Sequence, residues 1–420
     1  PPAAAGVDIL LTGPAVAPAG AAAPVQRIVR REAPTDGRTV LCLVDTPSGY
    51  LDAALLAGAF ERHGAASRVV VAALGDARQV GPAENYADVV DLPAVELHMH
   101  LGAGSIAQRT ADAALRCEAL LDEFLPDLVL PIGQSDDLVT CAMVAGRAGV
   151  PLLRIDAGVP PPAMFPAQRL NATLIDRMAG LLCTPSVATG RLLAQDGVPP
   201  ERVVTAGSVT LDGVTAADAA SPLTSALMSH HGLSHGYIVV TARVGAGRLS
   251  AQALGKFVLM LGRVRGDRPM LWLVCGETQS ALRAQGLGTV LSRAAVALAS
   301  MPVYSARLSI LKRASCLIAD AGDELVDAAM ALGTPVLLVD EDGDAPQPVD
   351  TQSRWLTLSA ADLGVEPLTA RRRAPAGGLA ADAVATHVAA WLSRLERGET
   401  GALPRPAEDA RPSALREAAP

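Results

Sequence analysis

The sequence is poor in aromatic residues, nearly devoid of lysine and without a long apolar run. Aromatic residues make up 3% of the chain although 50% of it is hydrophobic, so its cores must consist mainly of alanine, valine and leucine. The net charge of −8 provides no basic surface on which nucleic acid would bind non-specifically. The apolar runs fall well short of the ~18 residues that span a bilayer. We therefore expect neither nucleic acid nor a membrane as a partner.

The six cysteines show none of the spacings that are typical of metal sites or disulfide frameworks. There is no C-x-x-C motif, and four cysteines lie in or beside apolar, strand-like runs. This pattern favours buried, reduced thiols in a cytoplasmic protein. The histidines His98 and His100 lack a third ligand, so we interpret both as solvated loop residues. We predict no bound metal and no cofactor.

Strand-like and helix-like segments alternate through most of the chain. The first series begins with a strand over 38–45, a helix over 50–64 and a strand over 67–74. A third strand is expected in 87–92, and 105–124 has the apolar spacing of an amphipathic helix. Alternation of this kind predicts the α/β class, with parallel sheets and right-handed crossovers.

The alternating pattern lapses between residues 214 and 236, where small and polar residues predominate, and then resumes. We therefore predict two Rossmann-like, doubly wound parallel-sheet domains that face each other across a cleft. The predicted parts are a flexible segment 1–37, an N-terminal domain 38–214, a linker 215–236, a C-terminal nucleotide-binding domain 237–378, a closing helix 379–397 and a disordered tail 398–420.

In doubly wound domains ligands bind at the carboxyl ends of the strands, so residues that follow predicted strands are the candidates for chemistry. Asp156 ends the strand-like run VPLLRID, and Gly158 follows it. Asp156 has two interpretations, either a general base or an acid that orders its loop by accepting backbone N–H groups. Gly133, after the run DLVLPI, marks either a close approach of backbone to ligand or a tight turn.

The strand-end segments follow one another in a recognisable order. The first half carries IGQSDD, RIDAG, PAQRLNA, LLCTPS and TAGSVTLD, and the second half carries VTARVGA, YSARLSILKRA, DAGDELVD and LGTPVL. This series resembles the motifs of the non-hydrolysing UDP-N-acetylglucosamine 2-epimerases over about residues 39–340. The resemblance implies the GT-B arrangement of two Rossmann-like domains, a UDP-sugar ligand in the cleft between them, and a homodimer.

The departures from the family pattern concern the acid and base positions. The acid of the family's G-D-T segment corresponds to Gln134, its V-E-A-G glutamate to Asp156, its P-E-E carboxylates to Gln168 and Arg169, and its histidine to Arg243. A neutral amide cannot take a proton, and a guanidinium cannot return one at pH 7. The resemblance thus leaves Asp156 as the catalytic base, with Arg243 stabilising developing charge, and standard C2 epimerisation is not expected.

The phosphate-binding positions also differ. Basic residues of the family's first loop are replaced by Pro47 and Asp52. Arg243 and Arg248 flank a glycine loop before a predicted helix, an arrangement that suits a diphosphate and resembles the Arg/Lys pair of retaining GT-B glycosyltransferases. In such transferases a glutamate near the position of Asp327 holds the nucleotide ribose. The residues predicted to bind substrate or nucleotide are Gly133, Gln134, Gly158, Arg248, Gly322 and Asp327.

Three functions remain open at this point. The first is an epimerase-like protein that binds a sugar nucleotide in a rewired site. The second is a GT-B glycosyltransferase with a nucleotide-sugar donor. The third is an inactive pseudoenzyme that acts as a binding partner.

Overall fold

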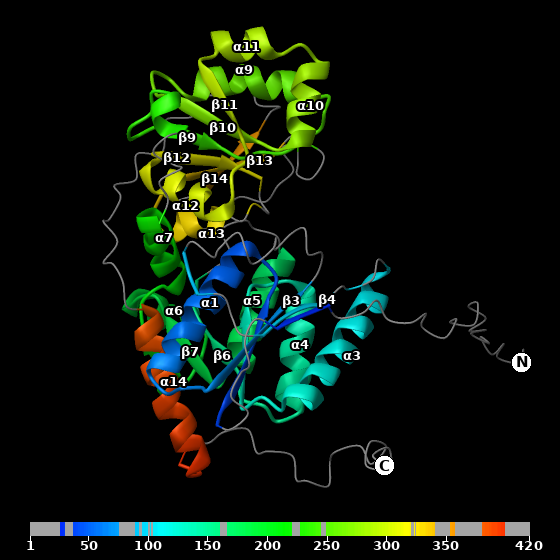
Figure 1. Ribbon diagram of the computed structural model, residues 1–420, viewed down its shortest axis with the longest axis vertical. Coiled ribbons are helices and arrows are strands. Elements are labelled where there is room, and N and C mark those ends of the chain that lie inside the picture. Colours follow the sequence, from blue (N-terminus) through cyan, green and yellow to red (C-terminus); the bar gives the residue numbers. More distant parts are fainter. Residues whose placement is uncertain are drawn as a thin grey trace, which may run out of the picture.

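The computed structural model describes residues 26–29, 37–74, 89–91, 95–99, 101, 104–159, 166–220, 227–244, 249–320, 323, 325–340, 353–357 and 380–399. Figure 1 shows two α/β domains stacked along the long axis of the molecule, each with helices packed around a sheet. The predicted class, two Rossmann-like doubly wound domains, is confirmed.

The N-terminal domain is built on a sheet with the strand order β1-β4-β3-β2-β5. These strands are β1 (Gln26–Val29), β2 (Thr39–Val44), β3 (Arg68–Leu74), β4 (Val95–Met99) and β5 (Leu128–Ile132). A bridge between Val129 and Leu152 extends the sheet to β6 (Leu153–Arg154), β7 (Leu181–Thr184) and β8 (Val203–Thr205). The strand order reverses between β2 and β5, so the topological switch point lies at the ends of these two strands.

Most helices of the N-terminal domain, though not α3 and α5, begin within four residues of the end of the preceding strand. They are α1 (Pro47–Arg62), α3 (Ile106–Phe124), α4 (Asp136–Arg147), α5 (Pro166–Met178), α6 (Val187–Gln195) and α7 (Val209–Ala220). Local sequence sets their starts, because Thr46 caps α1 ahead of Pro47, and Ser105 forms a capping box with Gln108 on α3. Several helix N-termini are thereby held at the edge of the sheet where the strands end.

The C-terminal domain repeats this topology in a parallel sheet of the order β11-β10-β9-β12-β13-β14. Its strands are β9 (Ile238–Val240), β10 (Met270–Val274), β11 (Val296–Ser300), β12 (Cys316–Ala319), β13 (Val336–Asp340) and β14 (Ser353–Thr357). Its helices are α9 (Leu254–Val264), α10 (Gly276–Ala284), α11 (Gly288–Arg293), α12 (Tyr304–Arg313) and α13 (Leu325–Ala331). The strand order reverses between β9 and β12, which is the second switch point.

The last helix, α14 (Ala380–Glu396), packs on the N-terminal domain, as Figure 1 shows in orange and red. Its first turn is held by Asp212 of α7, whose carboxylate accepts a hydrogen bond from the N–H of Ala381 at 2.9 Å. Near its other end, Glu396 forms a two-point ion pair with Arg38 at 2.8 Å. This ion pair connects the end of α14 to the residue that directly precedes β2.

One continuous apolar core joins the two domains. It runs from Phe60 of α1 through Val214 of α7 to Tyr304 of α12, all of which are at most 2% exposed. Helix α7 packs against α1 on one side and against α12 and α13 on the other. The relative position of the domains is thus set by packing of α7 as well as by the chain connection.

Three expectations from the sequence are wrong in detail. Residues 89–91 are not a strand, and the third strand of the first series is β4, which follows them. His98 lies buried in β4, where its Nε2 is 2.9 Å from Oε1 of the fully buried Glu96, so it is not a solvated loop residue. Part of the segment expected to be flexible forms β1, which pairs antiparallel with β4 because β4 would otherwise present an open edge.

The boundaries of the predicted linker, 215–236, stay a prediction. Helix α7 runs through the first residues of that range and ends at Ala220. His100 lies outside the described residues. Within the described residues, none of the helices combines the length and the apolar character needed to cross a membrane.

Candidate functional site

Three aspartates lie at or just beyond the carboxyl ends of strands near the switch points. Asp45 follows β2 and Asp156 comes two residues after β6 in the N-terminal domain, and Asp320 follows β12 in the C-terminal domain. Asp45 and Asp320 therefore stand at the two topological switch points, where ligands of doubly wound domains bind. The side chains around these three acids form the candidate site.

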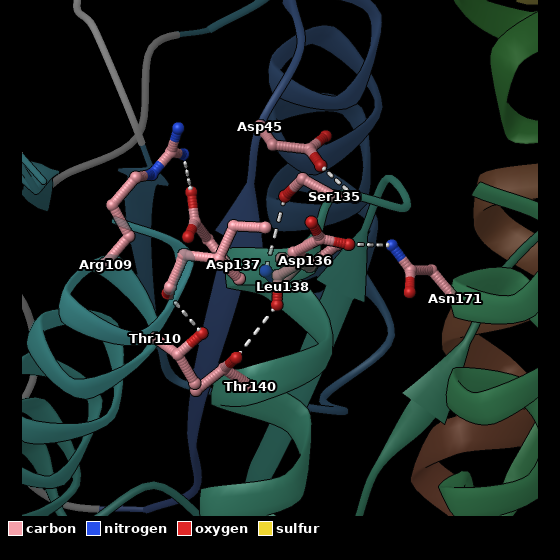
Figure 2. Close-up of polar contacts among 10 residues, drawn as sticks. Asp45, Arg109, Thr110, Ser135, Asp136, Asp137, Leu138, Thr140 and Asn171 are labelled. Atoms are coloured by element: carbon pink, nitrogen blue, oxygen red, sulfur yellow. Dashed lines mark hydrogen bonds and ion pairs between the residues drawn. The ribbon is translucent and has the colours of Figure 1, made fainter. Parts of the chain in front are cut away.

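Asp45 holds the loop that joins β5 to α4, as Figure 2 shows. Its Oδ2 accepts hydrogen bonds from the N–H groups of Gln134 at 3.2 Å and Ser135 at 2.9 Å. Gly133 has a φ of +128°, and a Cβ built on it would lie 1.8 Å from Asp45 Oδ1. Glycine is therefore required at this position by the conformation and by Asp45, with or without a ligand.

Two further acids surround the N-terminus of α4, where the helix dipole favours negative charge. The Asp136 carboxylate lies 2.7 Å from the amide nitrogen of Asn171, which also donates to the carbonyl of Gln134. The Asp137 carboxylate pairs with Arg109 at 2.5 Å (Figure 2). Both acids open the helix, while Ser135 supplies the cap by accepting from the N–H of Leu138. Side chains of the protein thus accept from the N–H groups of Gln134, Ser135 and Leu138 around this helix start.

Arg154 of β6 also holds the loop between β5 and α4 in place. This buried guanidinium donates to the carbonyls of Pro131 at 3.1 Å and Gly133 at 2.8 Å. Its Nε lies 3.5 Å from Asp176 of α5, which in turn accepts from the N–H of Gly158 at 3.2 Å. A buried arginine with this set of acceptors orders two strand ends at once.

Gly158 also has a packing reason for its identity. Its φ is +75°, and a Cβ would lie 2.8 Å from Leu193 Cγ and 2.9 Å from the Thr189 carbonyl oxygen of α6. The close approach that the sequence indicated is therefore an approach of α6 to the loop after β6.

Asp156 adopts a left-handed backbone conformation, with a φ of +47°, that aspartate tolerates better than most residues. Its carboxylate is 3.3 Å from the Thr210 hydroxyl, which also lies 2.8 Å from Asp52 Oδ2. Burial raises the pKa of Asp156, while hydrogen bonds from Ser208 and Thr210 and the charge of Arg154 oppose this shift. Asp156 thus interacts with the start of α7, and its role as a base stays a prediction.

The second switch point joins Arg243 to Asp320. The N–H of Arg243 donates to Asp320 Oδ2 at 2.8 Å, and its guanidinium Nε lies 3.6 Å from the same oxygen. The Arg243 side chain is 30% exposed, whereas Asp320 is 2% exposed. Burial raises the pKa of Asp320 to about 6, and the nearby Asp323 adds to the shift while Arg243 opposes it. An arginine in this position can still direct its remaining donors towards an anion.

The start of α13 also carries its own acid. The Asp323 carboxylate accepts from the N–H of Leu325 at 2.9 Å and is 5% exposed. The predicted site residues Arg248 and Gly322 lie outside the described residues. Asp327 lies in α13, and the structure does not describe its side chain. In the described part of the chain, no three histidine, cysteine or acidic side chains converge as metal ligands.

Of the predicted residues whose side chains or turns the structure describes, Gly133, Gln134, Asp156 and Gly158 follow β5 and β6 in the N-terminal domain and Arg243 lies at the second switch point; other residues beside them had not been named individually from the sequence. Asp45, Arg154, Asp176, Thr210 and Asp320 were not predicted. A sequence signal existed for Asp45 and Asp320, because each directly follows an apolar strand. Arg154 and Thr210 lie in the motifs RIDAG and TAGSVTLD, but neither was named individually, because their roles depend on partners far along the chain.

With this geometry in view, the chain can be compared with known proteins. A model of the UDP-N-acetylglucosamine 2-epimerase family matches residues 62–362, well over half of the sequence. The chain belongs to this family. The UDP-N-acetylglucosamine 2-epimerase of Methanococcus maripaludis is 21% identical over 277 residues, which are 64% of this chain and 75% of that protein. A probable epimerase of Ralstonia nicotianae is 21% identical over 285 residues, 66% of this chain and 76% of its own.

Solved structures of epimerases share the fold. The Methanocaldococcus jannaschii UDP-GlcNAc 2-epimerase in complex with UDP-GlcNAc and UDP has a TM-score of 0.61 and 14% identity, covering 84% of this chain and 99% of that one. The Neisseria meningitidis epimerase bound to UDP-GlcNAc has a TM-score of 0.54 and 17% identity, covering 71% and 82%. The GT-B arrangement expected from the motifs is therefore present in this family member.

Proposed function

We propose that this epimerase-family protein binds a UDP-sugar between its two domains and does not interconvert it by the family's C2 proton-transfer route. Membership of the family supports the ligand class, and two structural neighbours hold UDP-GlcNAc. Arg243, at the second switch point and partly exposed, is the described group best suited to an anionic diphosphate. A homodimer, implied by the family resemblance, is part of the proposal.

The proposal that the protein does not transfer a proton at C2 rests on the contacts that Gln134 and Asp156 make. Gln134 has no ionisable group; its N–H donates to the Asp45 carboxylate, and its carbonyl accepts from the Asn171 side chain of α5. Asp156, the remaining acid of the family set, accepts from the start of α7. A proton-transfer pair needs two titratable groups free to reach the sugar, and these two positions do not supply them.

Ligand binding is tested by a thermal shift. Saturating UDP or UDP-GlcNAc at about 100 Kd should stabilise the protein by roughly 2.7 kcal/mol. The increment on adding UDP should shrink in Arg243→Ala and stay unchanged in Arg263→Ala, which removes an exposed arginine from α9. A protein whose melting temperature ignores both ligands would contradict the proposed binding and favour a pseudoenzyme that acts on a partner.

The absence of epimerisation is tested by isotope exchange. Incubation of UDP-GlcNAc with the protein in deuterated water should leave the C2 position unlabelled. Labelling of C2 at enzymic rates would overturn this half of the proposal. Release of UDP that depends on an added acceptor would instead identify a glycosyltransferase.

A further inference from the structure

A cavity lies between the last helix, α14, and the outer part of the N-terminal sheet. Its volume is about 480 Å³, and Leu181 of β7 and Val204 of β8 contribute apolar side chains to its wall. β8 is the outer strand in the order β6-β7-β8. Ligand sites of this volume combine mostly apolar walls with a few polar groups that hold one end of the ligand.

The direction of α14 separates this cavity from the switch points. The helix begins beside Gly207, which follows β8, and it ends beside Arg38, which precedes β2. It therefore runs from the carboxyl ends of the strands towards their amino ends. The cavity is lined by the second half of the helix, whereas the candidate site lies at the carboxyl ends.

The helix side of the cavity is basic. The residues that line it recur every three or four positions and so share one face of the helix and of the turn that follows it: His387, Ala390, Arg394 and Arg397. Arg394 and Arg397 are both exposed, so their guanidinium groups can reach a molecule in the cavity without a change in the fold.

Ser393 adds a polar group to the same wall. Its Oγ accepts a hydrogen bond from Arg38 at 2.9 Å, so its own hydrogen can be donated to a ligand. Two acids near this end of the helix are each paired with an arginine. Glu396 accepts from Arg38 at 2.8 Å, and Glu399 accepts from Arg397 at 2.6 Å.

We propose that this cavity binds a small organic phosphate, with its phosphoryl group on Arg394 and Arg397 and its apolar part against Leu181 and Val204. The planar donor fork of arginine matches the oxygens of a phosphate, and two such forks side by side select this group over a neutral one. The Arg397–Glu399 pair is exposed at both side chains, and pairs of this kind contribute little to stability. Arg397 can therefore exchange the carboxylate for a phosphate.

This site is separate from the proposed UDP-sugar site and does not depend on it. Basic residues near the end of a helix also complement the helix dipole, which would account for Arg394 without any ligand. Arg147 provides the comparison, because it is an exposed arginine in the last turn of α4. A ligand site requires an effect of Arg394 that Arg147 does not share.

The proposal is tested by calorimetric titration of the full chain with phenyl phosphate, which carries a phosphoryl group on an apolar ring. Arg394→Gln should raise the Kd by about tenfold or more, because it removes a charged hydrogen-bond donor. Arg147→Gln should leave the Kd unchanged. Ala390→Trp fills the cavity and keeps every charge, and it should abolish binding. Inorganic phosphate and benzyl alcohol, which each carry half of the probe's chemistry, should bind at least about tenfold more weakly.

Three results would overturn the site. The first is a wild type that does not bind phenyl phosphate, or a Kd that Arg394→Gln and Arg147→Gln change equally. The second is binding that Arg243→Ala removes and Arg394→Gln does not, since the probe would then occupy the second switch point. The third is inorganic phosphate that binds as tightly as phenyl phosphate, because the apolar wall would then take no part. Binding of phenyl phosphate that Arg243→Ala leaves unchanged supports this site whether or not UDP binds between the domains.

Discussion

At the residue scale, burial makes the stability of the protein depend on the ionisation of Asp320, the acid that follows β12. Its pKa of about 6 lies above the ordinary value of 3.8, so the folded state holds more protons than the unfolded state between these two pH values. The free energy of unfolding therefore falls as the pH rises through this window and is flat above it. A shift of about two pKa units corresponds to about 3 kcal/mol.

Asp320→Asn should remove this pH dependence. Asparagine is neutral and keeps an oxygen that can accept from the Arg243 N–H. We expect the free energy of unfolding of the variant, relative to the wild type, to rise by about 3 kcal/mol from pH 4 to pH 7 in urea titrations. Asp122→Asn removes the same charge from an exposed position of α3 and serves as the control. Parallel pH profiles for Asp320→Asn and the wild type would show that Asp320 ionises normally.

The motifs identified some residues of the candidate site but not the groups that contact them. The sequence left open whether such a glycine marks a close approach to a ligand or a tight turn, and the structure gives both Gly133 and Gly158 positive φ values. The groups that approach them, Asp45 and Leu193, were not predicted, because they lie in other elements. A glycine indicates that there is little room for a side chain at its position. Which neighbouring group occupies that room depends on tertiary packing.

At the scale of elements, the junction of β5 and α4 requires glycine at position 133. Near the other end of α4, Gly146 has room for a side chain. Gly133→Ala would place a methyl group 1.8 Å from Asp45 Oδ1 in a φ region that alanine avoids. We expect it to lower the free energy of unfolding by about 2 kcal/mol or more. At Gly146, in α4, the nearest atom to an added Cβ is Leu152 Cδ1 at 3.7 Å.

Gly146→Ala should therefore raise stability, by about 0.5–1 kcal/mol, since alanine is the better helix former. Urea midpoints of the two variants against the wild type are the measurement. A neutral Gly133→Ala would mean that Asp45 does not occupy the position described.

Most elements were predicted with bounds close to those observed, because hydrophobic period and caps are local. The helix at 105–124, for instance, corresponds to α3 with its Ser105 cap. The third strand was misplaced, because β4 carries the polar residues Glu96 and His98 on one face. The two side chains meet in the interior at 2.9 Å beside Tyr50, whose hydroxyl lies 3.3 Å from Glu96. The strand VELHM does alternate apolar and polar residues, but the sequence alone does not show that its polar face is buried.

At the scale of the whole molecule, the continuous core implies that the two domains unfold together. We expect a single calorimetric transition whose van't Hoff and calorimetric enthalpies agree. Val214→Asp places a charge at a fully buried position of α7 within this core and should lower the melting temperature and split the transition in two. Val187→Asp, at the exposed first position of α6, is the same substitution and should leave a single transition. Two transitions in the wild type would contradict a shared core.

The sequence by itself determined the α/β class, the alternation of strands and helices in two series, and the order of motifs that resembles the epimerase family. These follow from residue periodicity and spacing, which act over a few neighbours. Only the tertiary structure decided which acids meet which partners, since Asp52 and Thr210 are 158 residues apart, and Arg243 and Asp320 are 77 apart. It also decided that α14 packs on the first domain, because that contact depends on a surface that α1, α7 and β7 form only when that domain is folded.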